Sequence, residues 1–251
     1  AKPAGGPAAA APSQPGAASV EVTDVKVNKT EQALAGIVIG FRADTVVGEP
    51  DTFPLAVADT MASGYTYPAG WLFEELRGRG LVYVVHAQNS PGRSKDLPGA
   101  FIVYAGCEPS KVNDVVDLIL ENIARLQGTP ADWNEKWYGR SKELIVVSDA
   151  MATQTATEQA TQAALDELYG LGHAWHRQFA QGIRSVAPEQ VREVSRNRLA
   201  RCVVTVSTPE PAAVSAKPGV RRYEKFPPVE LTPRGTQHDA GGGGSGGGSG
   251  R

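Results

Sequence analysis

The feature that most constrains the fold of this chain is the grouping of its strand-like segments into adjacent pairs. Residues 19–28 alternate apolar and polar side chains, and a denser apolar run at 33–43 follows directly. A second pair covers residues 81–89 and 99–107, and a single strand at 202–208 closes the pattern. A doubly wound sheet would instead alternate single strands with helices. The order therefore predicts an α+β fold with a mainly antiparallel sheet of about five to six strands packed against several helices.

Segments with helical periodicity separate and follow the strand pairs. The clearest begins at Val112, from which apolar side chains recur at helical spacing as far as Leu126, as on the buried face of an amphipathic helix. Further helices are predicted around residues 55–62, 71–79, from 129 onward, 154–169, 174–183 and 187–199. Most of the helical structure is thus expected in the second half of the chain.

Both ends of the chain differ in composition from its middle. Residues 1–18 are almost entirely Ala, Pro and Gly, and residues 215–251 are rich in Pro and polar groups and end in a Gly/Ser run. Such segments bury too little apolar surface to offset their ordering entropy. We therefore expect a flexible linker at 1–18, a single domain at 19–214 and a disordered tail at 215–251. The chain has no initiator Met and no signal-like segment, so we expect a fragment or processed product, with bacterial cytoplasm and periplasm both compatible.

The charge pattern excludes several classes of partner. The formal net charge is −2 and the pI is about 6.1, without a basic cluster that would favour nucleic acid or an anionic membrane. No apolar run approaches the roughly 18 residues that a membrane span needs. The two cysteines, Cys107 and Cys202, lie at strand-like positions, which favours buried free thiols, with a disulfide as the alternative.

The chain lacks the common catalytic and metal-binding motifs. It has no phosphate-binding glycine loop, no G-x-S-x-G and neither H-E-x-x-H nor its inverse H-x-x-E-H. His173 and His176 have metal-like spacing, but nothing nearby completes a zinc-ligand pattern, so we interpret them as a structural pair. We therefore predict no metal site in this chain and no evident means of activating water by itself.

Three blocks of sequence, in order, carry a resemblance to a known family. They are "WLFEELRGRGLVYVV" at 71–85, "GAFIVYAGCEPSK" at 99–111 and "DELYGLGHAWHRQFAQGIRSVAPEQVREVSRNRL" at 166–199. The corresponding patterns, beginning with "SRLFQELREKRGLAY", belong to the pitrilysin/insulinase family of zinc metallopeptidases, which includes the mitochondrial processing peptidase. The chain resembles one domain of the zinc-free, C-terminal half of such an enzyme.

The resemblance implies a function shared between two halves. A homologous partner half would carry zinc on H-x-x-E-H, and the zinc-free half would supply an Arg and a Tyr across the cavity that holds a peptide or unfolded protein substrate. By position, that pair is Arg77 and Tyr83. Peptide hydrolysis develops negative charge on the carbonyl oxygen, and preplaced donors such as a guanidinium and a phenol stabilise it.

The spacing of this pair departs from the family pattern. The family separates Arg and Tyr by seven positions, whereas "LRGRGLVY" separates Arg77 and Tyr83 by six. One residue fewer in a helical turn rotates the preceding residues by roughly 100°, so the sequence leaves open whether Arg77 converges on Tyr83, whether Arg79 takes its place, or whether both arginines only favour the helix end.

Further alternatives concern how the chain would bind substrate. Tyr65 and Tyr67 stand where the family often has a glycine-rich segment, and either line the cavity or pack. We expect "GAFIVYAG" to be an edge strand, along which strand addition is conceivable, although core packing is the preferred interpretation. Two other functions also remain open: a non-catalytic structural subunit resembling the core proteins of the respiratory cytochrome complex, and a stand-alone peptide-binding module.

Overall fold

The computed structural model describes residues 18–43, 46–64, 69–92, 96–97, 99–129, 132–133 and 135–223. Within them the chain forms a six-stranded sheet in the order β3-β4-β2-β5-β1-β6. Its strands are β1 (Ser19–Lys29), β2 (Ala35–Arg42), β3 (Val82–Ser90), β4 (Ala100–Cys107), β5 (Arg201–Thr208) and β6 (Gly219–Arg222). Only β1 and β5 pair in parallel, and the other neighbours are antiparallel. The predicted α+β fold with a mainly antiparallel sheet is confirmed.

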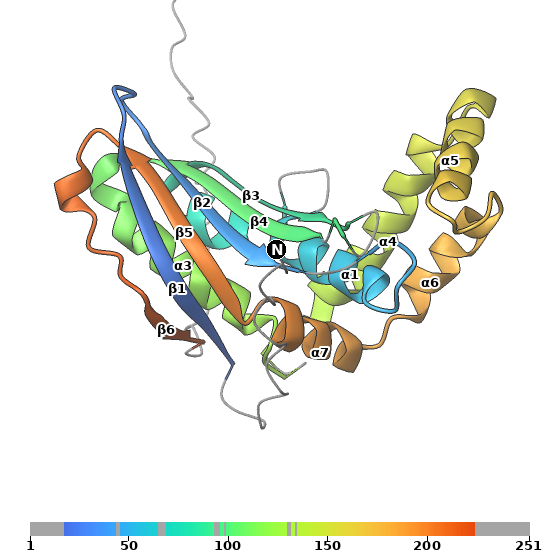
Figure 1. The fold of residues 1–251 in the computed structure, drawn as a ribbon. Helices are drawn as coiled ribbons and strands as arrows, with labels where there is room; N and C mark the ends of the chain where they lie inside the picture. Colours follow the sequence, from blue (N-terminus) through green and yellow to red (C-terminus); the bar gives the residue numbers. More distant parts are fainter. Residues whose placement is uncertain are drawn as a thin grey trace, which may run out of the picture.

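The helices fall between the strand pairs and in the second half of the chain (Figure 1). They are α1 (Thr52–Ser63), α2 (Gly70–Leu72), α3 (Val112–Arg125), α4 (Glu135–Ala152), α5 (Ala156–Leu168), α6 (Phe179–Ser185) and α7 (Pro188–Arg198). A π-helical turn, η1 (Phe73–Arg77), continues α2, and short 3-10 turns lie at η2 (Pro109–Lys111), η4 (Trp175–Gln178) and η5 (Pro211–Ala213). No helix of the described residues is long and apolar enough to cross a membrane.

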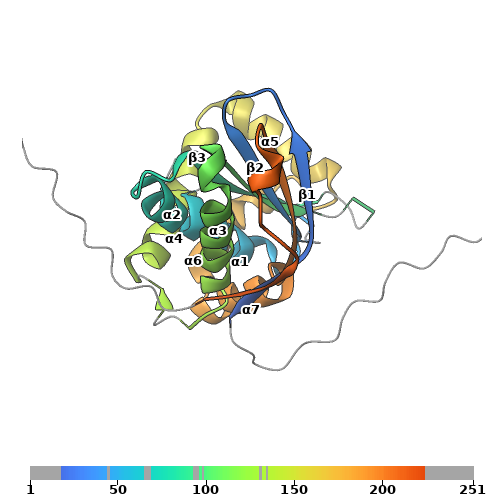
Figure 2. The same cartoon turned by 90° about the vertical axis from the view of Figure 1, so that its left-hand side faces the viewer.

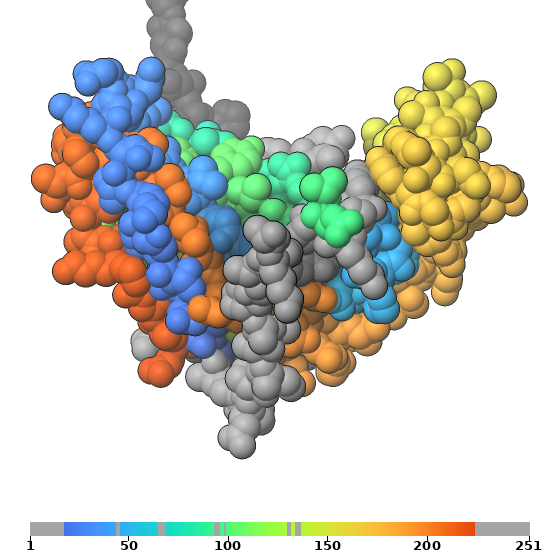
Figure 3. Space-filling view, viewed as in Figure 1, coloured from blue at the N-terminus to red at the C-terminus, as the bar shows by residue number. Residues whose placement is uncertain are grey.

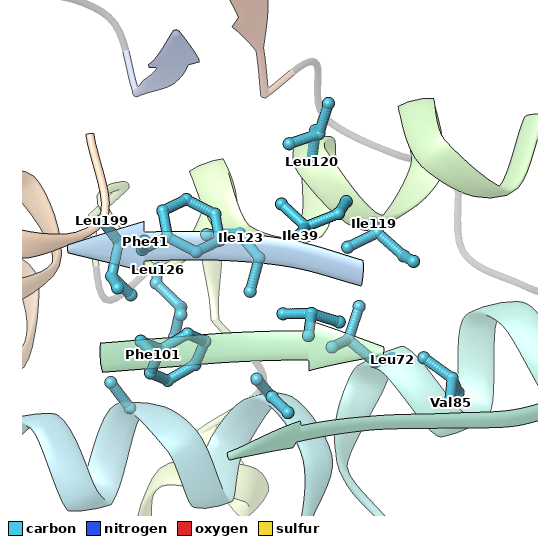
Figure 4. Packing of buried hydrophobic residues seen from close by; sticks show 14 of the residues in the cluster. Ile39, Phe41, Leu72, Val85, Phe101, Ile119, Leu120, Ile123, Leu126 and Leu199 are labelled. Carbon is cyan, nitrogen blue, oxygen red and sulfur yellow. The ribbon is translucent and has the colours of Figure 1, made fainter. Parts of the chain in front are cut away.

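One face of the sheet carries the hydrophobic core. Along β2 the side chains alternate, so that Ile37, Ile39 and Phe41 are buried and the residues between them are more accessible. The apolar side of α3 packs on this face through Ile119 and Ile123 (Figures 2 and 4). The alternation follows from the period of two along a strand, and it fixes which residues the opposite face presents.

The opposite face of the sheet, which we call the open face, is left uncovered by the described helices. It is turned toward the viewer in Figure 1, with α3 behind the strands. Several large apolar residues on it are 40% or more exposed: Val38, Val84, Tyr104 and Val203. Beside the sheet, α4, α5 and α6 project as an arm, and the surface is hollowed between the two (Figure 3). The fold thus has a concave side that the core does not fill.

Local details differ from the sequence-based expectations in three places. The helix expected from residue 129 begins at Glu135, because Thr129 forms a turn in which its main-chain N–H donates to Asp132 Oδ2 at 2.8 Å. The strand at 99–106 is not an edge, since β4 lies between β3 and β2. The sheet also continues past residue 214, where we ended the domain, because β6 pairs with the start of β1.

Candidate functional site

The turn that joins η1 to β3 carries the predicted pair Arg77 and Tyr83. In η1 the hydrogen bonds follow π-helical spacing, as shown by the Gly78 N–H that donates to Phe73 O at 3.3 Å. Gly80 then adopts a left-handed conformation, with φ of 68°, which a glycine accepts without the steric cost of a side chain. At the start of β3, the register with β4 shifts between Val82 and Val84. Tyr83 is therefore the additional residue of a β-bulge, and such bulges redirect side chains.

The structure brings Arg77 to Tyr83 through the main chain. Arg77 Nη1 donates a hydrogen bond to the carbonyl oxygen of Tyr83, although the two residues are only six positions apart. The Tyr83 side chain is 55% exposed. One guanidinium N–H is thus engaged, while the group has five in all. The contact ties the Arg77 side chain to the main chain of a residue whose own side chain is exposed.

Arg79 does not join this pair. Arg79 turns back along the helix and forms an ion pair with Glu75, with 2.6 Å between Nη2 and Oε2. Lys111 of η2, which follows β4, donates instead to the carbonyl oxygen of Gly80 at 3.2 Å. Tyr65 and Tyr67 lie outside the described residues. The side chains of Arg77, Arg79 and Lys111 therefore each make one contact that holds the turn, and only that of Arg77 involves Tyr83.

The outer edge of β3 is occupied by side chains from α1. Ser63 Oγ donates to Ala87 O at 2.9 Å, and Asp59 Oδ2 accepts the main-chain N–H of Asn89 at 3.1 Å. Asp59 is buried, and both its Oδ1 and the Asn89 Oδ1 lack a hydrogen-bond partner. Burial raises the pKa of Asp59 to about 7, against the smaller lowering effect of the Asn89 N–H. Together with Arg77, these contacts engage main-chain groups along much of the strand that carries Tyr83.

An aromatic pair on the open face was missed by the sequence reasoning. His86 of β3 lies opposite Tyr104 of β4, and their ring centroids are 5.8 Å apart. Partial burial lowers the pKa of His86, so its ring is neutral near pH 7. Neither residue belongs to a catalytic motif, and the signal that could have found them was the strand alternation, which places both on the face away from the core.

The remaining reactive groups of the described residues form no catalytic cluster. No three His, Cys, Asp or Glu side chains among them gather to hold a metal ion. His176 pairs with Asp149, with 2.9 Å between Nε2 and Oδ1, as expected of a structural residue. Cys107 and Cys202 are buried free thiols, which confirms the preferred interpretation. Burial raises the pKa of Cys107 to about 11 and that of Cys202 to about 12, so neither is a ready nucleophile.

Solved structures from several organisms share this fold. A conserved protein from Enterococcus faecalis V583 aligns over 74% of this chain and 42% of its own, with a TM-score of 0.63 and 17% identity. The peptidase M16 inactive domain from Pseudomonas fluorescens aligns over 78% and 45%, also with a TM-score of 0.63 and 17% identity. A chain of complex III2 from Candida albicans aligns over 76% and 47%, with a TM-score of 0.62 and 14% identity. This chain spans less than half the length of each of these relatives.

The sequence comparisons identify the family. Comparison with curated proteins gave no match. Residues 3–136, just over half of the chain, match the family described as the peptidase M16 inactive domain. The match contains both strand pairs, the η1 turn and the Arg77–Tyr83 site. The chain therefore belongs to the peptidase M16 inactive-domain family.

Proposed function

We propose that this chain is the zinc-free, substrate-binding domain of a metalloendopeptidase, and that Arg77 and Tyr83 serve its reaction as donors. The observation that supports this role is the hydrogen bond from the Arg77 guanidinium to the Tyr83 carbonyl, which ties the cation to the residue that carries the exposed phenol. The described residues hold no metal cluster, and we place the zinc on a homologous partner half.

The chemistry expected of the pair is electrostatic. As water adds to a peptide carbonyl, negative charge develops on the oxygen, and donors fixed beforehand stabilise that charge without reorganising during the reaction. Arg77 would offer its free guanidinium N–H groups, and Tyr83 its phenolic O–H. The Arg77 hydrogen bond to the Tyr83 main chain would hold the two donors in a constant relation. This side of the domain would face the partner half and the substrate between them.

A structural role is the alternative, and one observation favours it. The turn is one residue shorter than the family pattern, and one guanidinium N–H of Arg77 already donates a hydrogen bond to the main chain of Tyr83. A subunit that kept the fold without contributing to hydrolysis would tolerate both features. The two functions differ in what the Tyr83 hydroxyl does, which can be measured directly.

Replacing Tyr83 with Phe tests the catalytic proposal. A homologous zinc-bearing half, identified by its binding to this chain, would be combined with each variant, and cleavage of an internally quenched, flexible peptide would be followed. Loss of one preplaced donor is expected to lower kcat about 100-fold, corresponding to about 2.7 kcal/mol, with a smaller change in KM. Tyr169→Phe, which removes the same hydroxyl at the end of α5, should leave kcat unchanged.

Two results would favour the other readings. If Tyr83→Phe and Arg77→Ala both leave hydrolysis unchanged, the chain is a structural subunit. If the chain hydrolyses the peptide in a zinc-dependent manner without any partner, the proposal that the zinc lies on a separate half is wrong.

A further inference from the structure

The open face of the sheet is built from rows of residues that run across the strands. In one row, Val84, Gly106, Gly36 and Ser207 are cross-strand partners on β3, β4, β2 and β5. Two residues further along, His86, Tyr104, Val38 and Thr205 form the next row. The first row is low because its two central members are glycines, and the second stands higher because it carries two aromatic rings and a valine. We call them the glycine row and the aromatic row.

Gly36 and Gly40 of this face have no role within the domain that would require a glycine. A Cβ added to Gly36 or to Gly40 would have no heavy atom within 4 Å, and neither residue has a positive φ. Gly106 is tighter, since its Cβ would lie 3.2 Å from Val84 Cγ1. Glycine weakens a strand, and in strand interiors it often marks a place where another backbone approaches closely. The bare main chain at Gly36 therefore indicates contact with something outside the domain.

The charge of the face limits what that contact can be. Neither row contains an acidic, lysine or arginine side chain, and His86 is neutral near pH 7 because partial burial lowers its pKa. The charged residues of this face stand outside the two rows. Arg42 and Arg201 lie at strand ends beyond Gly40, and on β1 the paired Asp24 and Lys26 lie opposite Val203 and Thr205. Over the four strands of the rows, a strongly charged ligand would be desolvated without an adjacent counter-charge. An uncharged segment with apolar side chains matches the surface.

The glycine row is continuous with the catalytic pair. Val84, its first member, directly follows Tyr83 in the bulge of β3. From there the row crosses β4, β2 and β5 on the open face, which is turned toward the viewer in Figure 1. A chain held at Tyr83 would therefore meet the glycine row as it continues across the sheet.

We propose that an extended, uncharged peptide segment lies along the glycine row, with its apolar side chains against Tyr104 and Val38. The segment would be the part of the substrate next to the bond that is cleaved, so the inference rests on the proposed function. It adds a substrate class: flexible segments rich in apolar residues and free of Asp, Glu, Lys and Arg. The aromatic row would make the contacts that select apolar side chains of the peptide. The glycines, which lack side chains, would leave room for its main chain.

Gly36→Val tests this assignment without relying on catalysis. Valine favours strands and meets open space at this position, so the variant is expected to be at least as stable as the parent. It would nevertheless fill the glycine row. The probe is a capped ten-residue peptide of alternating Leu and Ser, titrated into the full chain while amide chemical shifts are followed by NMR.

We expect the peptide to shift the amides of Gly36, Tyr104 and Gly106, and Gly36→Val to weaken binding about tenfold or more. Gly139→Ala, a change in equally open space on α4, should not alter binding. Peptide binding is measured with this chain alone and hydrolysis only with the partner half present, so the effect of Gly36→Val on binding is independent of the effect of Tyr83→Phe on kcat. This separates a failure of the catalytic role from a failure of this one.

Other outcomes overturn the inference. Binding that is unaffected by Gly36→Val, or that shifts only amides elsewhere, would place the peptide on another surface. The same holds if the peptide does not bind at all, or if a peptide with Asp in place of Ser binds more tightly. Shifts of the open face that depend on protein concentration alone would assign it to a second copy of the chain.

Discussion

Asp59→Asn is expected to stabilise the domain at high pH and to have little effect at low pH. The buried carboxyl has a pKa of about 7 in the folded chain, against an ordinary value of 3.8. The folded state therefore keeps a proton that the unfolded state releases. Its contribution to stability is fully present below the unfolded pKa and is lost as the pH rises through the folded pKa. The difference corresponds to about 4 kcal/mol between about pH 4 and about pH 8.

The physical cause of the raised pKa is burial of the carboxyl, which a single main-chain donor offsets only in part. Asp59 Oδ2 accepts one main-chain N–H from Asn89, while Asp59 Oδ1 and the neighbouring Asn89 Oδ1 are buried without a partner. A protonated carboxyl or an Asn amide at position 59 can donate a hydrogen bond beside Asn89 Oδ1. A carboxylate can only accept, so its negative charge is buried with an oxygen that has no partner. The Asn variant should therefore retain its stability where the parent loses it.

Denaturant unfolding across this pH range, with parent and variant compared at each pH, measures the effect. Asp24→Asn is the matched control, because Asp24 is exposed and the hydrogen bond from Lys26 lowers its pKa. Its contribution has the opposite sign, being present above the unfolded pKa and lost as the pH falls. A free-energy difference between Asp59→Asn and the parent that stays constant with pH would contradict the assignment.

Trp71→Ala is expected to lower the free energy of unfolding by about 3–5 kcal/mol. Trp71 is only 2% exposed and is one of the largest fully buried side chains. The Arg125 guanidinium lies over its ring, with 4.7 Å between Cζ and the centroid, which adds a cation–π contribution. Because Trp71 belongs to α2, which η1 continues to Arg77, the cavity would also loosen the turn that carries the candidate site.

Two further tryptophan variants make this measurement specific. Trp71→Phe should cost much less, because it keeps most of the apolar area and removes an indole N–H that has no partner. Trp137→Ala is the control for the residue type, since Trp137 is only half-buried and donates to Glu74 Oε2 at 3.0 Å near the surface. The role of Trp71 as an anchor would be refuted if Trp71→Ala cost no more than Trp137→Ala in denaturant unfolding.

The fold could be predicted from the sequence where a periodic pattern reports directly on burial. The alternation at β2 and the helical spacing of α3 arise because the same residues that make the pattern face the core. The pairing of strands that are distant in sequence has no such local signal. The parallel pairing of β1 with β5, the interior position of β4 and the addition of β6 all depend on contacts between remote segments.

The candidate site was predictable as a list of residues but not as a geometry. Arg77 and Tyr83 stand out by position in the family pattern, whereas their meeting depends on a π-helical turn and a β-bulge on either side of Gly80. Both irregularities are set by the packing of neighbouring elements, and neither has a residue signature of its own. For the same reason the partner of Arg79, which is Glu75 one helical turn back, could not be chosen in advance.

The side-chain contacts along the outer edge of β3 have a consequence for how the protein behaves at high concentration. A terminal strand with free N–H and C=O groups is a template on which another molecule can pair. In β3, the carbonyls of Tyr83 and Ala87 and the N–H of Asn89 already have partners in Arg77, Ser63 and Asp59. A second molecule would have to displace these side chains before it could pair there. The edge that bears the candidate site is therefore protected against polymerisation into fibres, so the site can stay exposed to solvent without making the domain prone to aggregate.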